Sequence, residues 1–356
     1  MKSPLSAVRI AYDGYSADLD APGDRRRFCV YAHERGIEFE KARLDQPYDV
    51  VYITHGSDLP GWIARKRREG SSLRLIFELV DSYFTYSDRS YRFAKGLGRY
   101  ALGIDSRPSL DYRRLLAEAC SVSDAVICST VEQQTTIRKY NSNVFVSFDS
   151  FSNDFEVCKK EYTRRGRLKV VWEGMSTTLD NLVQLSATLN KHRDKIELHI
   201  VTDSKTYKLF NRFLVSDTVS RLGVFDCPVY FHPWDKKTFV RQIISSDLAI
   251  IPIDLANPMA NGKPENKLVS FWLLGMPVLT SPTPAYKRAM NEAGIAMICN
   301  DTEEWNSRLA DWINASESEF YELGHRVQQF ALNQYSMARF VKPFDDAFAA
   351  VGFKPC

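Results

Sequence analysis

The sequence predicts an α/β protein built from two doubly wound parallel-sheet domains, and three observations support that prediction. Short runs of Val, Ile and Leu alternate along the chain with longer amphipathic stretches, a pattern typical of parallel sheets covered by helices. The chain has 356 residues, more than one ordinary domain needs. The alternation stops over residues 149–167, a turn followed by a charged run, which we interpret as the boundary between the domains.

The first domain is predicted over residues 1–150, where each apolar run is followed by a polar turn and then a helical stretch. Gly36 and Gly70 mark two of the helix ends, because glycine continues a helix poorly. We expect strands over 8–12, 37–40, 49–54, 73–78, 124–128 and 144–147. We expect helices over 22–35, 60–69, 84–122 (interrupted by glycines and a proline) and 130–140.

The second domain is predicted over residues 168–335, where the same alternation resumes. We expect its strands over 168–172, 196–201, 229–231, 247–254, 278–280 and 295–298. We expect its helices over 178–191, 205–221, 236–245 and 268–274, with helical structure after the last strand.

Composition excludes several classes of protein. Hydrophobic residues at 44% and charged residues at 26% are those of a soluble globular chain, and a net charge of +3 is too small to indicate a nucleic-acid partner. No apolar run approaches the roughly 20 residues of a membrane-spanning helix, and the N-terminus carries no signal-peptide core. The 7 scattered cysteines include no C-x-x-C pair, which favours reduced thiols in a cytoplasm over a disulfide framework or a zinc site.

The most informative stretch follows the buried strand over 247–254. The loop G-K-P-E-N-K leads into the short apolar helix 268–274, after which Gly275 ends the helix and a new strand begins. Open α/β sheets bind ligands at the carboxyl ends of their strands, and helix N-termini receive anions there. Lys263, Asn266 and Lys267 at such a place suit a diphosphate, although exposed lysines beside a helix start are also common.

The run P-E-N-K-L-V-S-F-W-L-L-G-M-P-V is similar to the P-x-N-K…G-x-P-V signature of nucleotide-sugar glycosyltransferases with the two-domain GT-B fold, closest to the group 1 (GT4-like) type. The resemblance implies two Rossmann-like domains facing a cleft, the first binding the acceptor and the second the donor. It implies that helix 336–356 crosses back to the first domain. It also implies metal-independent transfer of a hexosyl or related group from a nucleotide-diphosphate sugar to an acceptor hydroxyl, with no further cofactor.

Several donor-binding residues follow from the resemblance. The family usually has a ribose-binding Glu where this chain has Ser270, and the acid nearby is Glu265. Gly174 matches a Gly-rich turn that lets the backbone approach the phosphates, and Ser176 stands where the family often has a basic clamp. His232 and Trp234 follow a strand at the place where the family holds the base. The alternatives are that the hydroxyls after Gly174 cap a helix and that the aromatic side chains close the sheet edge.

Four acid–base groups lie at predicted strand ends in the first domain: Asp13, His55, Glu78 and Asp81. An inverting transferase needs a carboxylate or an imidazole that takes the proton of the acceptor hydroxyl, and a retaining one often places a polar group near the anomeric centre. The run F-E-L-V-D resembles an F-D-x-x-D strand end in some family members. The sequence does not choose among the four residues.

The family also suggests partners and a setting. The acceptor would be a glycan or a lipid-linked sugar in the synthesis of a bacterial surface polysaccharide or glycolipid. The protein would be cytoplasmic, at the inner face of the membrane, with residues 62–68 resting on anionic lipid as a peripheral contact. The alternative for residues 62–68 is a solvated charged face of a helix. Two alternatives remain: a sugar-nucleotide 2-epimerase of the same architecture, and a catalytically degenerate scaffold or partner subunit.

Overall fold

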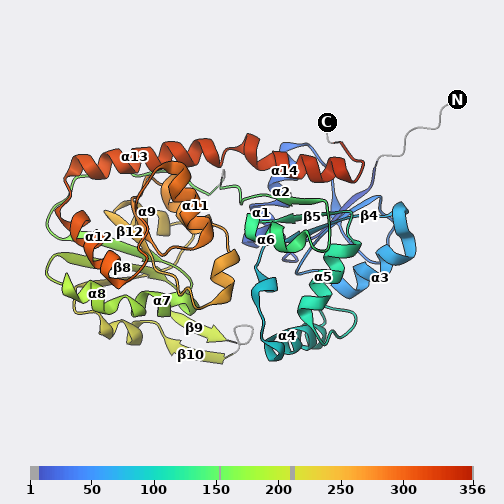
Figure 1. The fold of residues 1–356 in the computed structure, drawn as a ribbon, viewed down its shortest axis with the longest axis horizontal. Coiled ribbons are helices and arrows are strands. Elements are labelled where there is room, and N and C mark those ends of the chain that lie inside the picture. Colours follow the sequence, from blue (N-terminus) through green and yellow to red (C-terminus); the bar gives the residue numbers. More distant parts are fainter. Residues whose placement is uncertain (1–7, 152–153, 209–212, 355–356) are drawn as a thin grey trace. The chain divides into compact units, whose positions relative to one another are not determined.

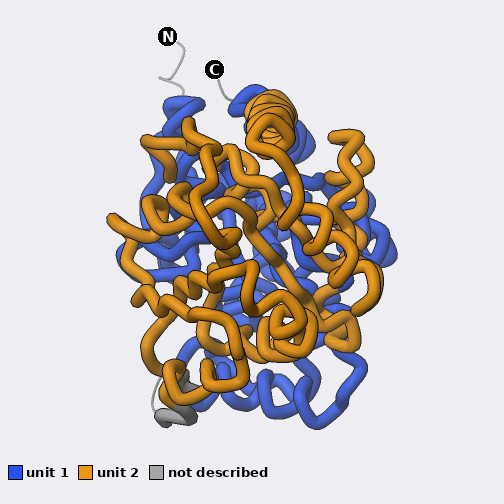
Figure 2. Tube along the Cα trace, turned by 90° about the vertical axis from the view of Figure 1, so that its left-hand side faces the viewer, with its two compact units in different colours: residues 1–150, 261–264, 336–356 blue, residues 151–260, 265–335 orange. Residues whose placement is uncertain are grey.

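The structure is a computed structural model that describes residues 8–151, 154–208 and 213–354. It divides into two compact units, coloured separately in Figure 2. Unit 1 comprises Met1–Ser150, Asn261–Pro264 and Ser336–Cys356, and unit 2 comprises Phe151–Ala260 and Glu265–Tyr335. Each unit is built on one parallel sheet with helices beside it, so the prediction of two α/β domains is confirmed.

Unit 1 contains a six-stranded sheet in the order β2-β1-β3-β4-β5-β6, and each neighbouring pair in it is parallel. Its strands are β1 (Ile10–Asp13), β2 (Glu40–Lys41), β3 (Val50–Thr54), β4 (Arg74–Leu79), β5 (Ala125–Cys128) and β6 (Val144–Val146). Its helices are α1 (Pro22–Arg25), α2 (Phe28–Glu34), α3 (Leu59–Glu69), α4 (Arg89–Ala101), α5 (Tyr112–Val122), α6 (Val131–Ile137) and α14 (Met337–Ala350), labelled in Figure 1. Strands β3 and β5 are buried along their whole length, because helices cover both faces of the sheet.

Helix α14 supplies part of the core of unit 1 although it comes last in the chain. Phe344 stacks on Tyr31 with ring centroids 4.8 Å apart, and Phe348 stacks on Tyr52. The Phe344 and Phe348 side chains are fully buried, and burial of such a side chain stabilises a fold by about 1.5–3 kcal/mol. Asp345 adds an ion pair, its Oδ2 lying 2.6 Å from Nη2 of Arg35.

Unit 2 contains a five-stranded parallel sheet in the order β11-β8-β7-β12-β13. Its strands are β7 (Leu168–Glu173), β8 (Ile196–Thr202), β11 (Val229–Pro233), β12 (Leu248–Ile251) and β13 (Val278–Thr280). Its helices are α7 (Leu179–Gln184), α8 (Ser186–Lys191), α9 (Phe239–Ile244), α10 (Asn266–Leu273), α11 (Pro284–Ala293), α12 (Thr302–Asn314) and α13 (Glu317–Gln334). In the described residues of both units, short 3-10 helices lie at 70–72, 83–85, 176–178, 219–224 and 258–262.

Several predicted elements differ from the structure. The helices expected over 22–35 and 178–191 are each divided in two, into α1 and α2 and into α7 and α8. The helix expected over 205–221 is wrong, because β9 (Lys205–Lys208) and β10 (Phe213–Asp217) pair as antiparallel strands, consistent with their β-branched and aromatic residues. The helical stretch over 84–122 is two helices, α4 and α5, separated at Pro108. The strand expected over 295–298 is reduced to one bridge, which pairs Ile298 with Thr280.

The sheet orders decide which strand ends come together. In unit 1, β1, β3 and β4 are consecutive, so the residues after these strands lie at one edge of the sheet. In unit 2, β7 lies between β8 and β12, so the turn after β7 lies beside the segment that leads from β12 into α10. These two edges carry most of the residues that the sequence proposed for chemistry.

Candidate functional site

Lys267 reaches from the first turn of α10 to the end of β7. Its ammonium donates a hydrogen bond to the backbone carbonyl of Glu173, and Nζ lies 3.3 Å from Oε2 of the same residue. Nζ also lies 5.7 Å from the centre of the Trp172 ring. The lysine is thus held over a strand end by a carbonyl, a carboxylate and an aromatic face.

Gly174 makes this position of Lys267 possible. A Cβ atom placed on Gly174 would lie 3.0 Å from Nζ of Lys267 and 2.8 Å from the nearest atom of the Trp172 ring. Both distances are shorter than ordinary side-chain contacts, so the absence of a side chain is what opens this space. The structure therefore brings together two residues that the sequence proposed separately. Glu173 was missed, although an acid directly before Gly174 at a strand end was a usable signal.

Other proposed donor residues are engaged within unit 2. Ser176 is buried and its hydroxyl donates to the carbonyl of Lys205, at 3.3 Å. Ser270 donates its hydroxyl to the carbonyl of Asn266 in the preceding helical turn, at 2.9 Å. Glu265 precedes α10, and its Oε1 accepts a hydrogen bond from the hydroxyl of Tyr335 at 3.0 Å. Burial raises the pKa of Glu265.

Lys263 belongs to segment 261–264, which is part of unit 1. Its side chain is exposed, whereas its neighbour Gly262 is buried. The carbonyl of Gly262 accepts hydrogen bonds from Oγ1 of Thr130 and Nε2 of Gln133, at 3.2 and 3.0 Å. A Cβ on Gly262 would lie 2.1 Å from Oγ of Ser82, so this segment also needs its glycine.

His232 and Trp234 lie at the end of β11, the edge strand of the unit 2 sheet. Nε2 of His232 lies 3.1 Å from Nδ1 of His199, whose Nε2 lies 3.2 Å from Oε1 of Glu197. Burial, followed by the neighbouring His199, lowers the pKa of His232. Trp234 is exposed and stacks on Phe239 with ring centroids 5.5 Å apart. The hydrogen-bonded row of Glu197, His199 and His232 was not predicted, because it joins two strands that lie far apart in the sequence.

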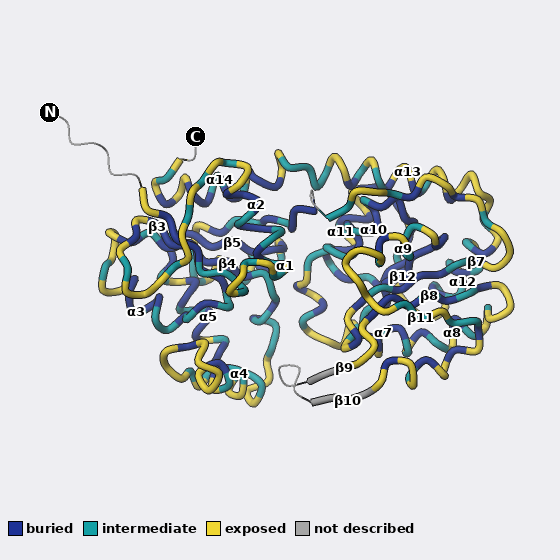
Figure 3. Tube along the Cα trace, turned by 180° about the vertical axis from the view of Figure 1, so that it is seen from behind, coloured by how far each residue is buried: buried dark blue, intermediate teal, exposed yellow. Residues whose placement is uncertain are grey.

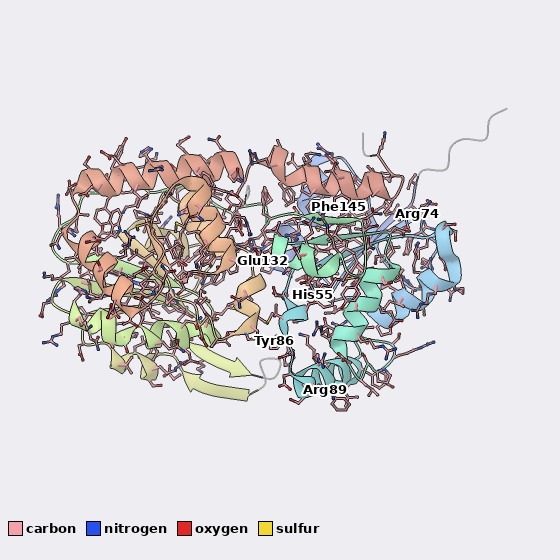
Figure 4. All side chains as sticks on the ribbon, viewed as in Figure 1. His55, Arg74, Tyr86, Arg89, Glu132 and Phe145 are labelled. Atoms are coloured by element: carbon pink, nitrogen blue, oxygen red, sulfur yellow. The ribbon has the colours of Figure 1, made fainter. Side chains whose placement is uncertain are left out.

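In unit 1, His55 and Asp81 follow the neighbouring strands β3 and β4. Nε2 of His55 lies 3.9 Å from Oδ2 of Asp81. The imidazole lies between the rings of Tyr15 and Tyr83, with centroids 5.1 and 5.2 Å away, and His55 is labelled in Figure 4. Burial lowers the pKa of His55 to about 4, despite the opposing effect of Asp81. The imidazole is therefore neutral at pH 7 and a weak base.

A cation that the sequence did not single out lies beside this pair. Nζ of Lys95, on α4, lies 4.1 Å from the centre of the Tyr83 ring. Burial lowers the pKa of Lys95, and its charge also lowers the pKa of His55. No sequence signal distinguished Lys95, because α4 carries three other basic residues.

Asp13 and Glu78 are held by other side chains. Oδ2 of Asp13 accepts a hydrogen bond from Nε1 of Trp62 at 2.8 Å, and burial raises the pKa of Asp13. Glu78 is fully buried, and its Oε1 lies 2.5 Å from Nε of Arg27, itself fully buried. Glu78 also accepts hydrogen bonds from the hydroxyls of Tyr52 and Tyr15, at 2.9 and 3.1 Å. These contacts favour a structural role for Glu78 in unit 1.

The structure does not show the membrane surface expected over 62–68. Trp62 and Ile63 are buried, and so are Arg65 and Lys66. Lys66 donates to the carbonyls of Gly70 and Leu73, so its charge is used inside unit 1. In the described parts of the chain, no helix combines the length and apolar character needed to cross a bilayer. Likewise, no three His, Cys, Asp or Glu side chains of residues 8–151, 154–208 and 213–354 are grouped so as to hold a metal ion.

Comparison with known proteins shows the fold. No protein-family profile matches the sequence, and no curated protein matches it. Among solved structures, the chain is similar to S. aureus TarM, solved as a mutant with Fondaparinux, alpha-GlcNAc-glycerol and UDP, with a TM-score of 0.56 and 10% identity over 85% of this chain and 55% of that one. It therefore spans about half the length of TarM. It is also similar to WaaG, a glycosyltransferase involved in lipopolysaccharide biosynthesis, with a TM-score of 0.53 and 13% identity over 97% of this chain and 100% of that one.

A third similarity, to sucrose-phosphate synthase from Thermosynechococcus elongatus, has a TM-score of 0.53 and 11% identity over 91% of this chain and 76% of that one. These neighbours share two Rossmann-like domains, and the chain has the GT-B fold that its sequence predicted. Identities this low show the fold alone. What the chain does is argued from its own residues.

Proposed function

We propose that the chain is a glycosyltransferase that moves a sugar from a nucleotide-diphosphate sugar to an acceptor hydroxyl. Lys267, held over Gly174 at the end of β7, is the observation that supports this function most directly. The GT-B fold of the chain agrees with it, but fold alone does not establish an activity.

On the donor side, unit 2 would bind the nucleotide and its diphosphate. The diphosphate would lie against the side-chain-free edge of Gly174, with the ammonium of Lys267 and the first backbone N–H groups of α10 directed to its oxygens. These groups would stabilise the negative charge that develops on the departing nucleotide, which is how the reaction would proceed without a metal ion. Before the donor binds, Glu173 keeps Lys267 extended across the strand end.

The ion pair of Lys267 can be exchanged for an anionic ligand. Without a ligand, the ammonium of Lys267 pairs with the carboxylate of Glu173, whose side chain is part-exposed. An exchange of that carboxylate for a diphosphate is favourable because two phosphate groups carry more negative charge than one carboxylate. Glu265, bonded to Tyr335, would place the start of α10 and leave one oxygen for a ribose or sugar hydroxyl.

On the acceptor side, unit 1 would supply the group that takes the hydroxyl proton. Asp81 and His55 are the candidates, since Glu78 is bound by Arg27 and Asp13 by Trp62. The His55 imidazole lies 3.9 Å from the part-exposed carboxylate of Asp81, so an acceptor hydroxyl beside this pair would be within reach of both groups. Burial makes the imidazole a weak base, which favours Asp81 as the group that takes the proton. The acceptor would be a glycan or lipid-linked sugar in bacterial surface polysaccharide or glycolipid synthesis, at the cytoplasmic face of a membrane.

Thermal unfolding with nucleotides tests the donor site first. UDP, GDP, CMP and dTDP would be added separately, and a nucleotide at about 100 times its Kd adds about 2.7 kcal/mol to the free energy of unfolding. Incubation of the nucleotide sugar that binds with candidate acceptors, followed by analysis of nucleotide release and products, then tests transfer. A sugar epimerised in the absence of any acceptor would indicate the 2-epimerase.

A scaffold or partner subunit is the second candidate, and one observation favours it. The hydroxyls of Ser176 and Ser270 are used within unit 2, and Lys267 already has an acidic partner. A transferase that had lost its activity would keep the fold, while side chains that once bound the donor would bond to other parts of the protein. Absence of a thermal shift with every nucleotide, for a protein that unfolds cooperatively, would support the scaffold and contradict the transferase.

A further inference from the structure

The ammonium of Lys95, on α4 of unit 1, has no acidic partner. Nζ lies 4.1 Å from the centre of the Tyr83 ring and 5.3 Å from the centre of the Tyr112 ring. In the described ranges 8–151, 154–208 and 213–354, no carboxylate pairs with this ammonium and no oxygen accepts a hydrogen bond from it. Lys95 is part-exposed, so its three N–H groups are available to a ligand.

The other basic side chains on the same side of α4 are already paired. Arg92 lies three residues before Lys95 and Arg99 lies four residues after it, so the three share one side of the helix. Nη1 of Arg92 lies 3.5 Å from Oδ2 of Asp111, and Nη2 of Arg99 lies 2.7 Å from Oδ1 of Asp105. Of the three basic residues on this described helix face, Lys95 alone keeps a charge without a counterion.

Packing of α4 fixes Lys95 in this place. Gly96 lies against the loop that leads to α5, where an added Cβ would lie 2.3 Å from the backbone oxygen of Ser109. The outward face of the helix carries the exposed side chains of Phe93 and Leu97. Figure 3 shows α4 as a helix in which exposed residues alternate with more buried ones. Rotation of the helix would break its ion pairs and force the backbones apart, so Lys95 stays on the inner face.

Tyr83 lies between Lys95 and Asp81, the residue proposed to take the acceptor proton. The hydroxyl of Tyr83 donates to Oδ2 of Asp81 at 3.3 Å, while the face of the same ring lies beneath Nζ of Lys95. Nε2 of His55 lies 3.9 Å from that Oδ2 atom. Burial lowers the pKa of Lys95, and the negative charge of Asp81 opposes this effect. A proton-accepting carboxylate and an unpaired ammonium therefore flank one tyrosine ring.

We propose that Lys95 binds the carboxylate of a uronic acid in the acceptor. This inference rests on the proposed transfer, in which Asp81 takes the proton of the acceptor hydroxyl. The hydroxyl that receives the sugar would lie at Asp81, and the carboxylate of the same acceptor sugar would lie at Lys95. A charge-assisted hydrogen bond from the ammonium would then hold the acceptor in one orientation. Lys95 would thus determine acceptor specificity.

The charges around Lys95 favour a carboxylate over other groups. A single ammonium is neutralised by a single negative charge. A phosphate monoester carries about two negative charges at pH 7 and would leave the second one near Asp81. Arg92 and Arg99 do not offer a second cation, because each already has an acidic partner. A neutral sugar would leave the part-buried ammonium without a counterion, which is unfavourable.

Binding is tested first, because it needs no donor. Saturation-transfer NMR titrations of the full chain would use methyl β-glucuronide and methyl α-galacturonide, each compared with the neutral glycoside of the same configuration, and glucose 6-phosphate. At least one uronide should bind roughly 10-fold more tightly than its neutral counterpart, as a hydrogen bond to a charged group predicts. Added salt should weaken binding of that uronide more than binding of the neutral glycoside.

Three variants isolate the charge of Lys95. Lys95→Met keeps the length of the side chain and its contact with the tyrosine rings, so it should bind the charged and neutral glycosides alike. Lys95→Arg keeps the charge and should retain the preference for the uronide. Lys139→Met, at an exposed position of unit 1, is the matched control and should behave as wild type does. Thermal unfolding, alone and with the nucleotides, checks the folding and donor binding of each variant.

Transfer then separates this inference from the proposed function. With the nucleotide sugar that binds, Lys95→Met should lower kcat/KM by roughly 10-fold for the uronide and little for the neutral glycoside. Equal transfer to both glycosides would support the transferase and overturn the inference. Uronide binding that depends on Lys95 without transfer to any acceptor would support the role of Lys95 in binding and contradict the transferase.

The binding data can also overturn the inference directly. Equal binding of charged and neutral glycosides by the wild-type chain, or no binding of any uronide, would do so. Tighter binding of glucose 6-phosphate than of either uronide would assign the ammonium to a phosphate instead. A preference for the uronide that persists in Lys95→Met would place the carboxylate at another residue.

Discussion

The ammonium of Lys267 lies directly beside Gly174: a Cβ atom on residue 174 would lie 3.0 Å from Nζ of the lysine, so even an alanine would crowd it. Gly174 follows β7 and Lys267 lies in the first turn of α10, which comes after β12, so the parallel pairing of β7 with β12 brings the two residues together. The ammonium is thereby held where the backbone presents no side chain, so an anion can approach both at once. Two predictions follow from this contact.

Lys267→Ala is expected to lower turnover by roughly 10²-fold, as loss of one preorganised electrostatic contact in a reacting site commonly does. The measurement is steady-state kinetics with the nucleotide sugar that the binding experiment identifies. Lys191→Ala, at an exposed position of α8, is the matched control and should behave as wild type does. Near-wild-type kinetics for Lys267→Ala would remove this lysine from the mechanism.

Gly174→Ala should lower donor affinity because the new methyl group displaces the ammonium of Lys267. Overpacking of this kind also destabilises a protein by about 1–3 kcal/mol. A double-mutant cycle with Lys267→Ala measures the coupling by titration with the nucleotide. If Gly174→Ala weakens binding as much in the Lys267→Ala background as in the wild type, the two residues act separately and the interpretation is wrong.

His55 should make the stability of the protein depend on pH. Its pKa is lowered by burial from 6.5 to about 4, so the unfolded chain binds a proton that the folded chain does not between these values. The stabilisation from the neutral imidazole is therefore complete above pH 6.5 and is lost as pH falls towards 4, at a rate approaching about 1.4 kcal/mol per pH unit. Urea unfolding across this range, compared with His55→Gln, isolates the contribution. Parallel curves for the two proteins would contradict the assignment.

Glu78→Gln should unfold the protein more easily without acting on chemistry. Removal of one charge of a buried ion pair costs about 3–5 kcal/mol when the other is left unpaired. Here the fully buried Arg27 keeps Asp149, 3.0 Å from its Nη1, so we expect a cost at the lower end of that range. Glu118→Gln, which removes a part-exposed ion pair with Arg67, should cost no more than about 1 kcal/mol. Chemical denaturation measures both. A stable Glu78→Gln protein with little turnover would instead indicate catalysis by this carboxylate.

Trp234→Ala tests whether the end of β11 holds the base of the nucleotide. Stacking of a base on an aromatic side chain is worth about 1–3 kcal/mol, so nucleotide affinity should fall by that amount. Tyr321→Ala, an equally accessible aromatic position on α13, is the control. Calorimetric titration would show unchanged affinity if Trp234 only packs on Phe239.

The fold was predictable because its signals are local. Apolar runs between helical stretches identified most strands, and Gly36, Gly70 and Gly275 marked turns that the structure confirms with positive φ angles. The region 205–221 was predicted as a helix because its polar and apolar residues do not alternate cleanly, and pairing between its two halves decides the outcome.

The candidate site was only partly predictable, for a related reason. Glycine, lysine and strand-end acids can be located along the chain, but their partners depend on which strands become neighbours. The bond between His199 and His232 and the ion pair between Arg27 and Glu78 each join residues more than thirty positions apart. The outward face of α4 could not be distinguished from a buried one, because its spacing is that of any amphipathic helix.

The return of α14 to unit 1 has a consequence for how the chain matures during synthesis. Strands β1 to β6 leave the ribosome long before Phe340, Phe344 and Phe348, yet the aromatic rings on one face of their sheet are covered by those three side chains. Until α14 has been synthesised, that face of the sheet is therefore covered only in part, by α2, whereas unit 2 has all its segments once Tyr335 has been added.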